Sequence, residues 1–147
     1  MYYLEDLHEG MTFNLGSVEI SKNAIIEFAE RYDPQKFHLD EEVATSMFGG
    51  LIASGYQTMS LYQRLLVDGF LGMTACMASP GLDDVQFIRP VFAGDLLTGH
   101  LAILSARRSQ SKPNRGVVKL EMKLLNAADE PVLGMTGMIM VEARTQG

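Results

Sequence analysis

Asp33 and His38 are the two side chains of this sequence whose types and spacing best suit acid–base chemistry. They stand five positions apart, and a glycine-dotted segment from Phe48 to Gly55 begins ten residues after His38. A carboxylate and an imidazole that converge on one water molecule can remove and return a proton at neutral pH. The glycine-dotted segment offers backbone N–H groups for an anion. This short region therefore predicts a site that adds or removes water.

Short helices are expected to position the pair. Ser21 is suited to cap a helix whose apolar residues follow helical spacing. That helix must stop before Pro34, because the residue preceding a proline is steered away from the helical region, and Asp33 is that residue. Asp40 to Ser46 is expected to form a short helical turn that Asp40 caps, and Phe48 to Gly55 a loop with three glycines.

A long apolar helix is expected next, from Tyr56 to Phe70. At about 1.5 Å per residue it would be roughly 21 Å long. Apolar residues cover much of its circumference, so other elements must surround it. Six strand-like runs are expected, at Thr12–Ile20, Leu71–Ala78, Asp83–Phe92, Leu96–Arg107, Gly116–Leu125 and Val132–Ala143. The order predicts one α+β domain over residues 1–147, a curved antiparallel sheet wrapped around the central helix. As the residue opening that helix, Gly55 could offer its N–H to a developing oxyanion.

Composition narrows the class of protein. Hydrophobic residues make up 47% and charged residues 20%, as in ordinary globular domains. The formal net charge of −6 argues against a general nucleic-acid binder, which needs a basic surface. Four cations, Arg107, Arg108, Lys112 and Arg115, do fall within nine residues. A solvated turn is the favoured interpretation, and a docking place for ligand phosphates is the alternative.

The apolar runs, the cysteine and the methionines of the sequence bear on cellular location and on metal binding. No run of eighteen or more apolar residues is present, and the acidic N-terminal segment lacks signal-peptide features, so a cytoplasmic protein without a membrane partner is expected. The single cysteine, Cys76, is interpreted as a small core residue rather than a nucleophile. The ten methionines indicate an adaptable apolar core or tunnel, and no metal site is expected because potential ligands do not cluster at metal spacings.

The order of elements and a set of residues resemble the MaoC-like dehydratase family, which includes the (R)-specific enoyl-CoA hydratases of the hotdog fold. The resemblance covers nearly the whole chain. It is carried by the Asp33 to His38 spacing, Asp40, Phe48-Gly49, Ile52-Ala53, Gly55, Arg89-Pro90-Val91 and Gly94-Asp95. The chain departs from the family pattern at Gln35 and Lys36, where many members have asparagine and proline, and at Ser54, where histidine is frequent.

The resemblance implies reversible hydration of a 2-enoyl thioester, with coenzyme A as part of the substrate and no separate cofactor. It implies that Asp33 and His38 hold and activate the water, and that the Gly55 N–H polarises the thioester carbonyl. Substrate contacts are expected from Phe48, Gly49, Gly50, Ser54 and Tyr56. His8 and His100 are given no function.

Two other functions stay open for this sequence. The same carboxylate and water could attack the thioester carbonyl, as in a hotdog acyl-CoA thioesterase, because a fold does not decide a function. The chain could also be a non-catalytic acyl-binding or partner subunit. Members of the family usually pair, and a lone unit would leave sheet edges open, so a homodimer or larger homo-oligomer is expected.

Overall fold

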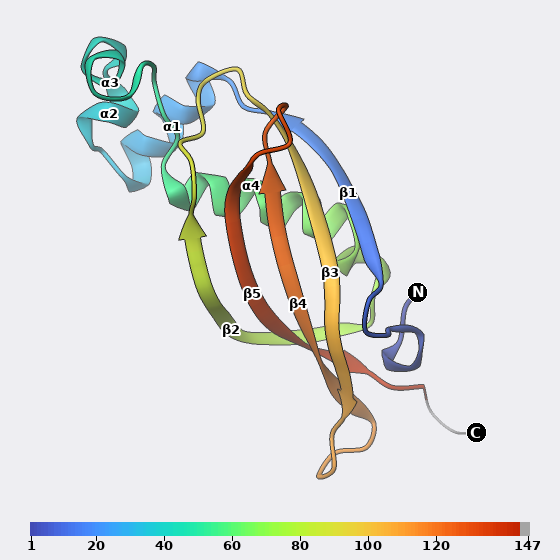
Figure 1. Ribbon diagram of the computed structural model, residues 1–147. Coiled ribbons are helices and arrows are strands. Elements are labelled where there is room, and N and C mark those ends of the chain that lie inside the picture. The colour runs from blue at the N-terminus through green and yellow to red at the C-terminus, as the bar shows by residue number, and fades with distance from the viewer. Residues whose placement is uncertain (145–147) are drawn as a thin grey trace.

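The computed structural model describes residues 1–144, which form one five-stranded antiparallel sheet with helices on its concave side (Figure 1). The strand order is β1-β3-β4-β5-β2, so the strands before and after the helices lie at opposite edges. The strands are β1 Thr12–Glu19, β2 Cys76–Phe87, β3 Leu96–Arg108, β4 Arg115–Leu125 and β5 Pro131–Glu142.

Four α-helices and two short 3₁₀ turns complete the described chain. They are η1 Leu4–Asp6, α1 Lys22–Tyr32, α2 Lys36–Leu39, α3 Glu41–Phe48, α4 Gly55–Gly69 and η2 Leu71–Met73. The sheet curves around α4, while α1, α2 and α3 gather near one end of the sheet (Figure 1). The predicted α+β arrangement, a curved sheet around one long helix, is confirmed.

Helix α4 is held by burial of its sheet-facing side. Tyr62, Leu65 and Leu66 are buried, and the Tyr62 hydroxyl donates to the His100 carbonyl of β3 at 2.7 Å. A buried tyrosine hydroxyl without such a partner would be costly, so this bond also fixes how α4 lies on the sheet.

The predicted extent of α1 and the predicted cap of α3 are confirmed, but α3 continues to Phe48, two residues beyond the expected end at Ser46. The Ser21 hydroxyl accepts a hydrogen bond from the Ala24 N–H and caps α1, which ends at Tyr32 before Asp33 and Pro34. Asp40 caps α3 by accepting from the N–H groups of Glu42 and Val43. The additional helix α2, four residues long, was not predicted from the sequence.

Two of the predicted strands form a single strand, so the expectation of six strands was wrong. Strand β2 runs through the expected turn at Ser79-Pro80-Gly81 and takes in residues of both runs. It lies at the sheet edge, where a proline needs no ladder partner on the free side. The register against β5 shifts between Ala78 and Gly81, so the turn residues produce an irregularity in the strand.

The four cations of residues 107–115 lie around the β3–β4 hairpin, at the end of the sheet away from α1, α2 and α3 (Figure 1). Arg108 donates to the Glu5 carboxylate at 2.8 Å and to the Pro113 carbonyl at 2.6 Å. Within residues 1–144, no helix is long and apolar enough to cross a membrane.

Candidate active site

Asp33 is placed by the end of α1. It is the C-cap of that helix, and its backbone N–H still donates to the Ala29 carbonyl at 2.9 Å. Its carboxylate has two side-chain donors: Gln35 Nε2 lies 2.6 Å from Oδ1, and the Ser54 hydroxyl lies 2.7 Å from Oδ2. Both partners donate to the charged form, so the carboxylate is held in one orientation as an anion.

These donors lower the pKa of the Asp33 carboxyl. The hydrogen bond from Gln35 is the largest cause and that from Ser54 the next, and together they outweigh the opposing effect of burial. Because the pKa is lower in the folded than in the unfolded chain, ionised Asp33 stabilises the fold at pH values above its ordinary pKa. That stabilisation is lost as the pH falls through the lowered folded-state value. At neutral pH Asp33 is therefore fully ionised and can accept a hydrogen bond from water.

Replacing Gln35 with leucine is expected to raise the pKa of Asp33, because it removes the donor with the largest effect. Carboxyl-carbon NMR titration of Asp33 would measure the change. Lys36→Leu is the matched control: Lys36 is the next residue in the chain, is also exposed and makes no hydrogen bond to Asp33. An unchanged Asp33 titration in Gln35→Leu would contradict the assignment of this donor.

His38 is fixed by the loop that precedes α4. It lies in α2, is only 4% exposed, and its Nδ1 is 2.7 Å from the Ile52 carbonyl oxygen. A carbonyl only accepts, so Nδ1 carries the hydrogen, and in the neutral ring Nε2 presents a lone pair. Nε2 lies 3.4 Å from Asp33 Oδ2. Two proton acceptors therefore face one another, an arrangement suited to a shared water molecule.

The N-terminus of α4 lies beside this pair. Ser54 caps α4 through its hydroxyl, which also donates to Asp33, and Gly55 is the first helical residue. N–H groups in the first turn of a helix have no partner within the helix, and the helix dipole is positive there. A Cβ on Gly55 would come within 2.6 Å of the Phe87 ring, so glycine lets β2 approach this N-terminus closely.

A pocket of about 330 Å³, which we call the dyad pocket, joins these groups. Asp33, His38, Gly55 and Tyr56 all line it, together with the ends of β2 and β5. The three residues proposed for catalysis from the sequence are thus brought to one cavity. Gln35, Thr58 and Phe87 also line it but were not predicted as site residues. Of these three residues, only Gln35 could have been suspected from the sequence, because it stands two residues after Asp33.

Of the five residues predicted to contact substrate, only Tyr56 lines the dyad pocket. Tyr56 stands at the dyad pocket with its side chain largely in solvent. Ser54 has no exposed surface and lies behind Asp33, so it acts on the carboxylate rather than on a ligand. Phe48 ends α3, Gly49 adopts a left-handed conformation as its C-cap, and Gly50 abuts Phe92. These last three lie outside the residues that line the pocket, and a substrate role for them remains a prediction.

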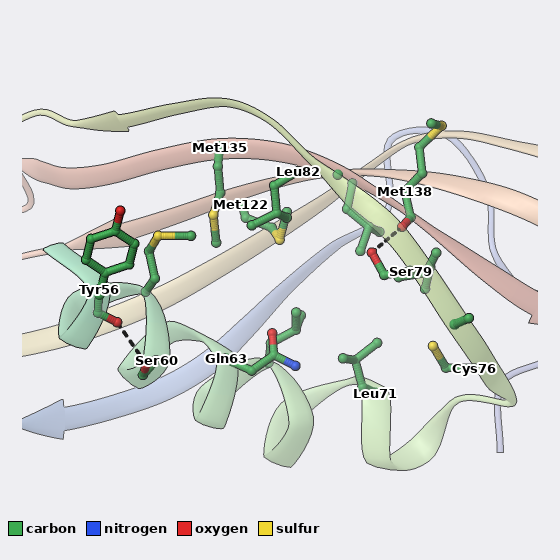
Figure 2. Close-up of a pocket in the computed structure, with 16 residues that line it drawn as sticks. Tyr56, Ser60, Gln63, Leu71, Cys76, Ser79, Leu82, Met122, Met135 and Met138 are labelled. Carbon is green, nitrogen blue, oxygen red and sulfur yellow. Dashed lines mark hydrogen bonds between the residues drawn. The ribbon is translucent and has the colours of Figure 1, made fainter. Parts of the chain in front are cut away.

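A second and larger cavity, of about 520 Å³, lies between α4 and the sheet (Figure 2). We call it the methionine cavity, because the side chains of Met59, Met122 and Met135 contribute to its wall, whereas the side chain of Met138 points away from it. Cys76 also lines it, and burial raises the pKa of its thiol, which disfavours a nucleophilic thiolate. Among residues 1–144 no three histidine, cysteine or acidic side chains lie close enough to hold a metal ion.

Comparison with known proteins identifies the family. The model of the MaoC-like domain matches residues 8–123. The chain belongs to the MaoC-like domain family. The uncharacterized protein YdeM of Bacillus subtilis (strain 168) is 33% identical over 132 residues, which cover 88% of this chain and 91% of that protein.

Solved structures of MaoC-like proteins share the fold. The crystal structure of a MaoC-like dehydratase from Rhodospirillum rubrum is 35% identical, with a TM-score of 0.91 over 99% of this chain and 100% of that one. The unliganded (R)-hydratase PhaJ1 from Pseudomonas aeruginosa shares the fold at 23% identity and a TM-score of 0.75, covering 97% of this chain and 86% of that one. The expected hotdog fold is confirmed. The MaoC-like family supports a hydratase or dehydratase function.

Proposed function

We propose that this protein is a hydro-lyase that reversibly adds water to a 2-enoyl thioester and forms a 3-hydroxyacyl thioester. The observation that carries the proposal is the facing pair of acceptors, His38 Nε2 and Asp33 Oδ2, 3.4 Å apart in the dyad pocket. The second polar atom of each side chain already has a partner: Asp33 Oδ1 accepts from Gln35, and His38 Nδ1 donates to the Ile52 carbonyl. The two atoms are too close for a water to lie between them, so in this proposal the water lies beside both, hydrogen-bonds to them and turns a lone pair towards a substrate carbon.

The proposed reaction conserves protons. As the water oxygen bonds to the β-carbon, one member of the pair takes a proton from that water and the double-bond electrons move towards the thioester carbonyl. The same pair then returns a proton to the α-carbon, so the site finishes in its starting state. Acid–base action of this kind contributes about 10²–10⁴ in rate.

The negative charge that develops on the thioester oxygen needs a donor. The N–H of Gly55 opens α4 and lies at the same pocket as the pair. In this proposal it binds the oxyanion, with support from the helix dipole. A donor in that role is worth about 10²–10³ in rate.

The experiment that tests the function is a panel of short, medium, branched and aromatic trans-2-enoyl-CoA substrates. Loss of enoyl absorbance without release of free thiol is the expected result for at least one member. Thiol release from saturated acyl-CoA would indicate a thioesterase instead. Tight binding without turnover of any member would indicate a non-catalytic acyl-binding subunit. The same panel on pantetheine and carrier protein would identify the carrier, for which coenzyme A is proposed.

The proposal includes a homodimer formed through β2. Every residue from Met77 to Phe87 is exposed, although Met77, Leu82, Val85 and Phe87 are apolar. This edge strand has twelve residues, and one of its sides is unpaired. A long apolar edge invites pairing with another strand, and a second copy supplies an identical one around a twofold axis. Pairing there would also cover the open side of the methionine cavity, which β2 helps to line.

Replacing Val85 with lysine is expected to convert the dimer to a monomer at micromolar concentration, because a charge on an edge strand opposes strand pairing. Val117→Lys is the matched control. Both valines are 37% exposed, but Val117 belongs to β4, whose two sides are already paired. Gel filtration with light scattering gives the mass directly. A wild-type protein that is monomeric under these conditions would contradict the dimer.

A further inference from the structure

A third hollow, of about 560 Å³, lies at the junction of α1 and α4 and shares no lining residue with the dyad pocket or the methionine cavity. We call it the α1 hollow, because α1 forms most of its wall and Gln57 of α4 completes it. The wall residues of α1 are Ala24, Glu27, Phe28, Glu30, Arg31 and Tyr32. The reaction proposed above uses none of these residues, so the hollow is open to a separate role.

Gln57 is a buried side chain with an unused acceptor. It is 6% exposed, and its Nε2 donates to the Ala24 carbonyl of α1 at 2.9 Å. A carbonyl only accepts, so the amide nitrogen faces Ala24 and Oε1 is the remaining polar atom. Within residues 1–144 this Oε1 has no hydrogen-bond partner. A buried acceptor without a donor costs free energy, so the hollow favours a ligand that brings an N–H or O–H group.

The charges around the hollow favour a cation. Glu27 and Glu30 supply two carboxylates against the single positive charge of Arg31, and in the described part of the chain none of the three forms a salt bridge. Helix α1 ends at Tyr32, so the negative end of its dipole also lies here. A cation that donates hydrogen bonds would therefore pair with the carboxylates and satisfy Gln57 Oε1 as well.

Two aromatic rings give such a cation a flat surface. Phe28 and Tyr32 stand one helical turn apart, with ring centroids separated by 5.1 Å and planes tilted by 54°. Tyr32 is 70% exposed, so a ligand can reach its ring. A guanidinium group stacks on aromatic rings and presents several N–H donors in one plane, whereas an alkylammonium is a compact point charge. Rings, carboxylates and one buried acceptor together suit a guanidinium group best.

We propose that the α1 hollow binds a guanidinium group, carried either by a small metabolite or by an arginine side chain of a peptide. One N–H donates to Gln57 Oε1, the two carboxylates pair with the charge, and the plane of the group lies against Tyr32. A ligand held there joins α1, which ends beside Asp33, to the first turn of α4, which begins at Gly55. The inference does not rest on the proposed hydratase function.

Titration of the wild-type protein with N-butylguanidinium, followed by calorimetry and by NMR, tests the site. The dissociation constant is expected to be on the order of 1 mM, as for a ligand of so few atoms. The matched control ligand, n-butylammonium, is expected to bind about fivefold more weakly, because it lacks the planar group. The side-chain NH₂ signal of Gln57 is expected to shift, because its nitrogen shares the amide with Oε1. No saturable binding, or equal affinity for the two cations, would overturn the proposal.

Gln57→Leu tests the buried acceptor. Leucine keeps an apolar bulk of similar size but removes Oε1, so the affinity for N-butylguanidinium is expected to fall at least about tenfold, the value of a hydrogen bond to a charged group. Glu27→Gln leaves the buried residues intact and is expected to weaken binding about threefold. Gln63→Leu is the matched control, since Gln63 is a glutamine of the same helix that lies outside the α1 hollow, and it should retain the wild-type affinity. An unchanged affinity in Gln57→Leu, or in Glu27→Gln if the leucine variant does not fold, would overturn the assignment.

The source of the guanidinium group is distinguished by one further probe, N-acetyl-arginine methylamide. This compound places the group on a peptide backbone without adding another charge. Binding about fivefold tighter than that of N-butylguanidinium would indicate an arginine side chain of a peptide, and weaker binding would indicate a small metabolite. All of these measurements record binding without turnover, so a failure of the hydratase function is recognised separately, by the enoyl-CoA panel.

Discussion

Replacing Asp33 with asparagine is expected to lower kcat by about 10²–10⁴-fold while the fold persists. Asparagine keeps the size and shape of the side chain but cannot take a proton from water. In the wild type, Gln35 and Ser54 hold this carboxyl ionised at neutral pH, so its loss removes a base that is fully charged under assay conditions. Steady-state rates on a trans-2-enoyl-CoA substrate would measure the effect.

Asp40→Asn is the matched control for that substitution. Asp40 caps α3 and does not line the dyad pocket, and asparagine is as good a helix cap as aspartate. We therefore expect Asp40→Asn to retain wild-type kcat and thermal stability. Turnover in Asp33→Asn within a few-fold of the wild type would exclude Asp33 as the base.

Replacing His38 with glutamine is expected to reduce kcat over a similar range, about 10²–10⁴-fold. The glutamine amide can still donate to the Ile52 carbonyl, which is the bond that His38 Nδ1 makes. It cannot also present the basic lone pair that Nε2 directs towards Asp33. His8→Gln is the control, since His8 is exposed and lies outside the pocket.

The double variant Asp33→Asn/His38→Gln distinguishes a shared water from two independent actions. Residues that act as one unit are strongly non-additive, so the double variant should lose little more than the worse single variant. If the two losses instead multiply, the residues act separately, and the proposal of one water shared by Nε2 and Oδ2 is wrong.

The extent of α1 and the start of α3 could be predicted because each has a local cause, whereas α2, which carries His38, was not predicted. Ser21 and Asp40 begin helices as caps, and Pro34 ends one at Asp33, all through contacts within a few residues. The convergence of Asp33, His38 and Gly55 on one pocket depends on the tertiary structure. It could be anticipated only through the resemblance to the MaoC-like family, since spacing alone does not place side chains.

Other features depend on contacts that no local pattern records. Strand β2 continues through Pro80 because an edge strand tolerates proline, and edge position is decided by the whole sheet. His38 is anchored by the backbone carbonyl of Ile52. Every residue has a backbone carbonyl, so the sequence does not show which one will bind the imidazole. The methionine content indicated an apolar core or tunnel, but the position of the cavity between α4 and strands β2, β4 and β5 depends on how the whole sheet curves around the helix.

Product analysis in heavy water tests the central claim most directly. A trans-2-enoyl-CoA substrate incubated with the protein in D₂O and followed by NMR should give a 3-hydroxyacyl-CoA with a hydroxyl on the β-carbon and one deuterium on the α-carbon. Asp33→Asn should give no such product on the same timescale. A wild-type reaction that leaves the double bond intact and yields a carboxylate with free coenzyme A, or no reaction with any enoyl thioester, would contradict the account.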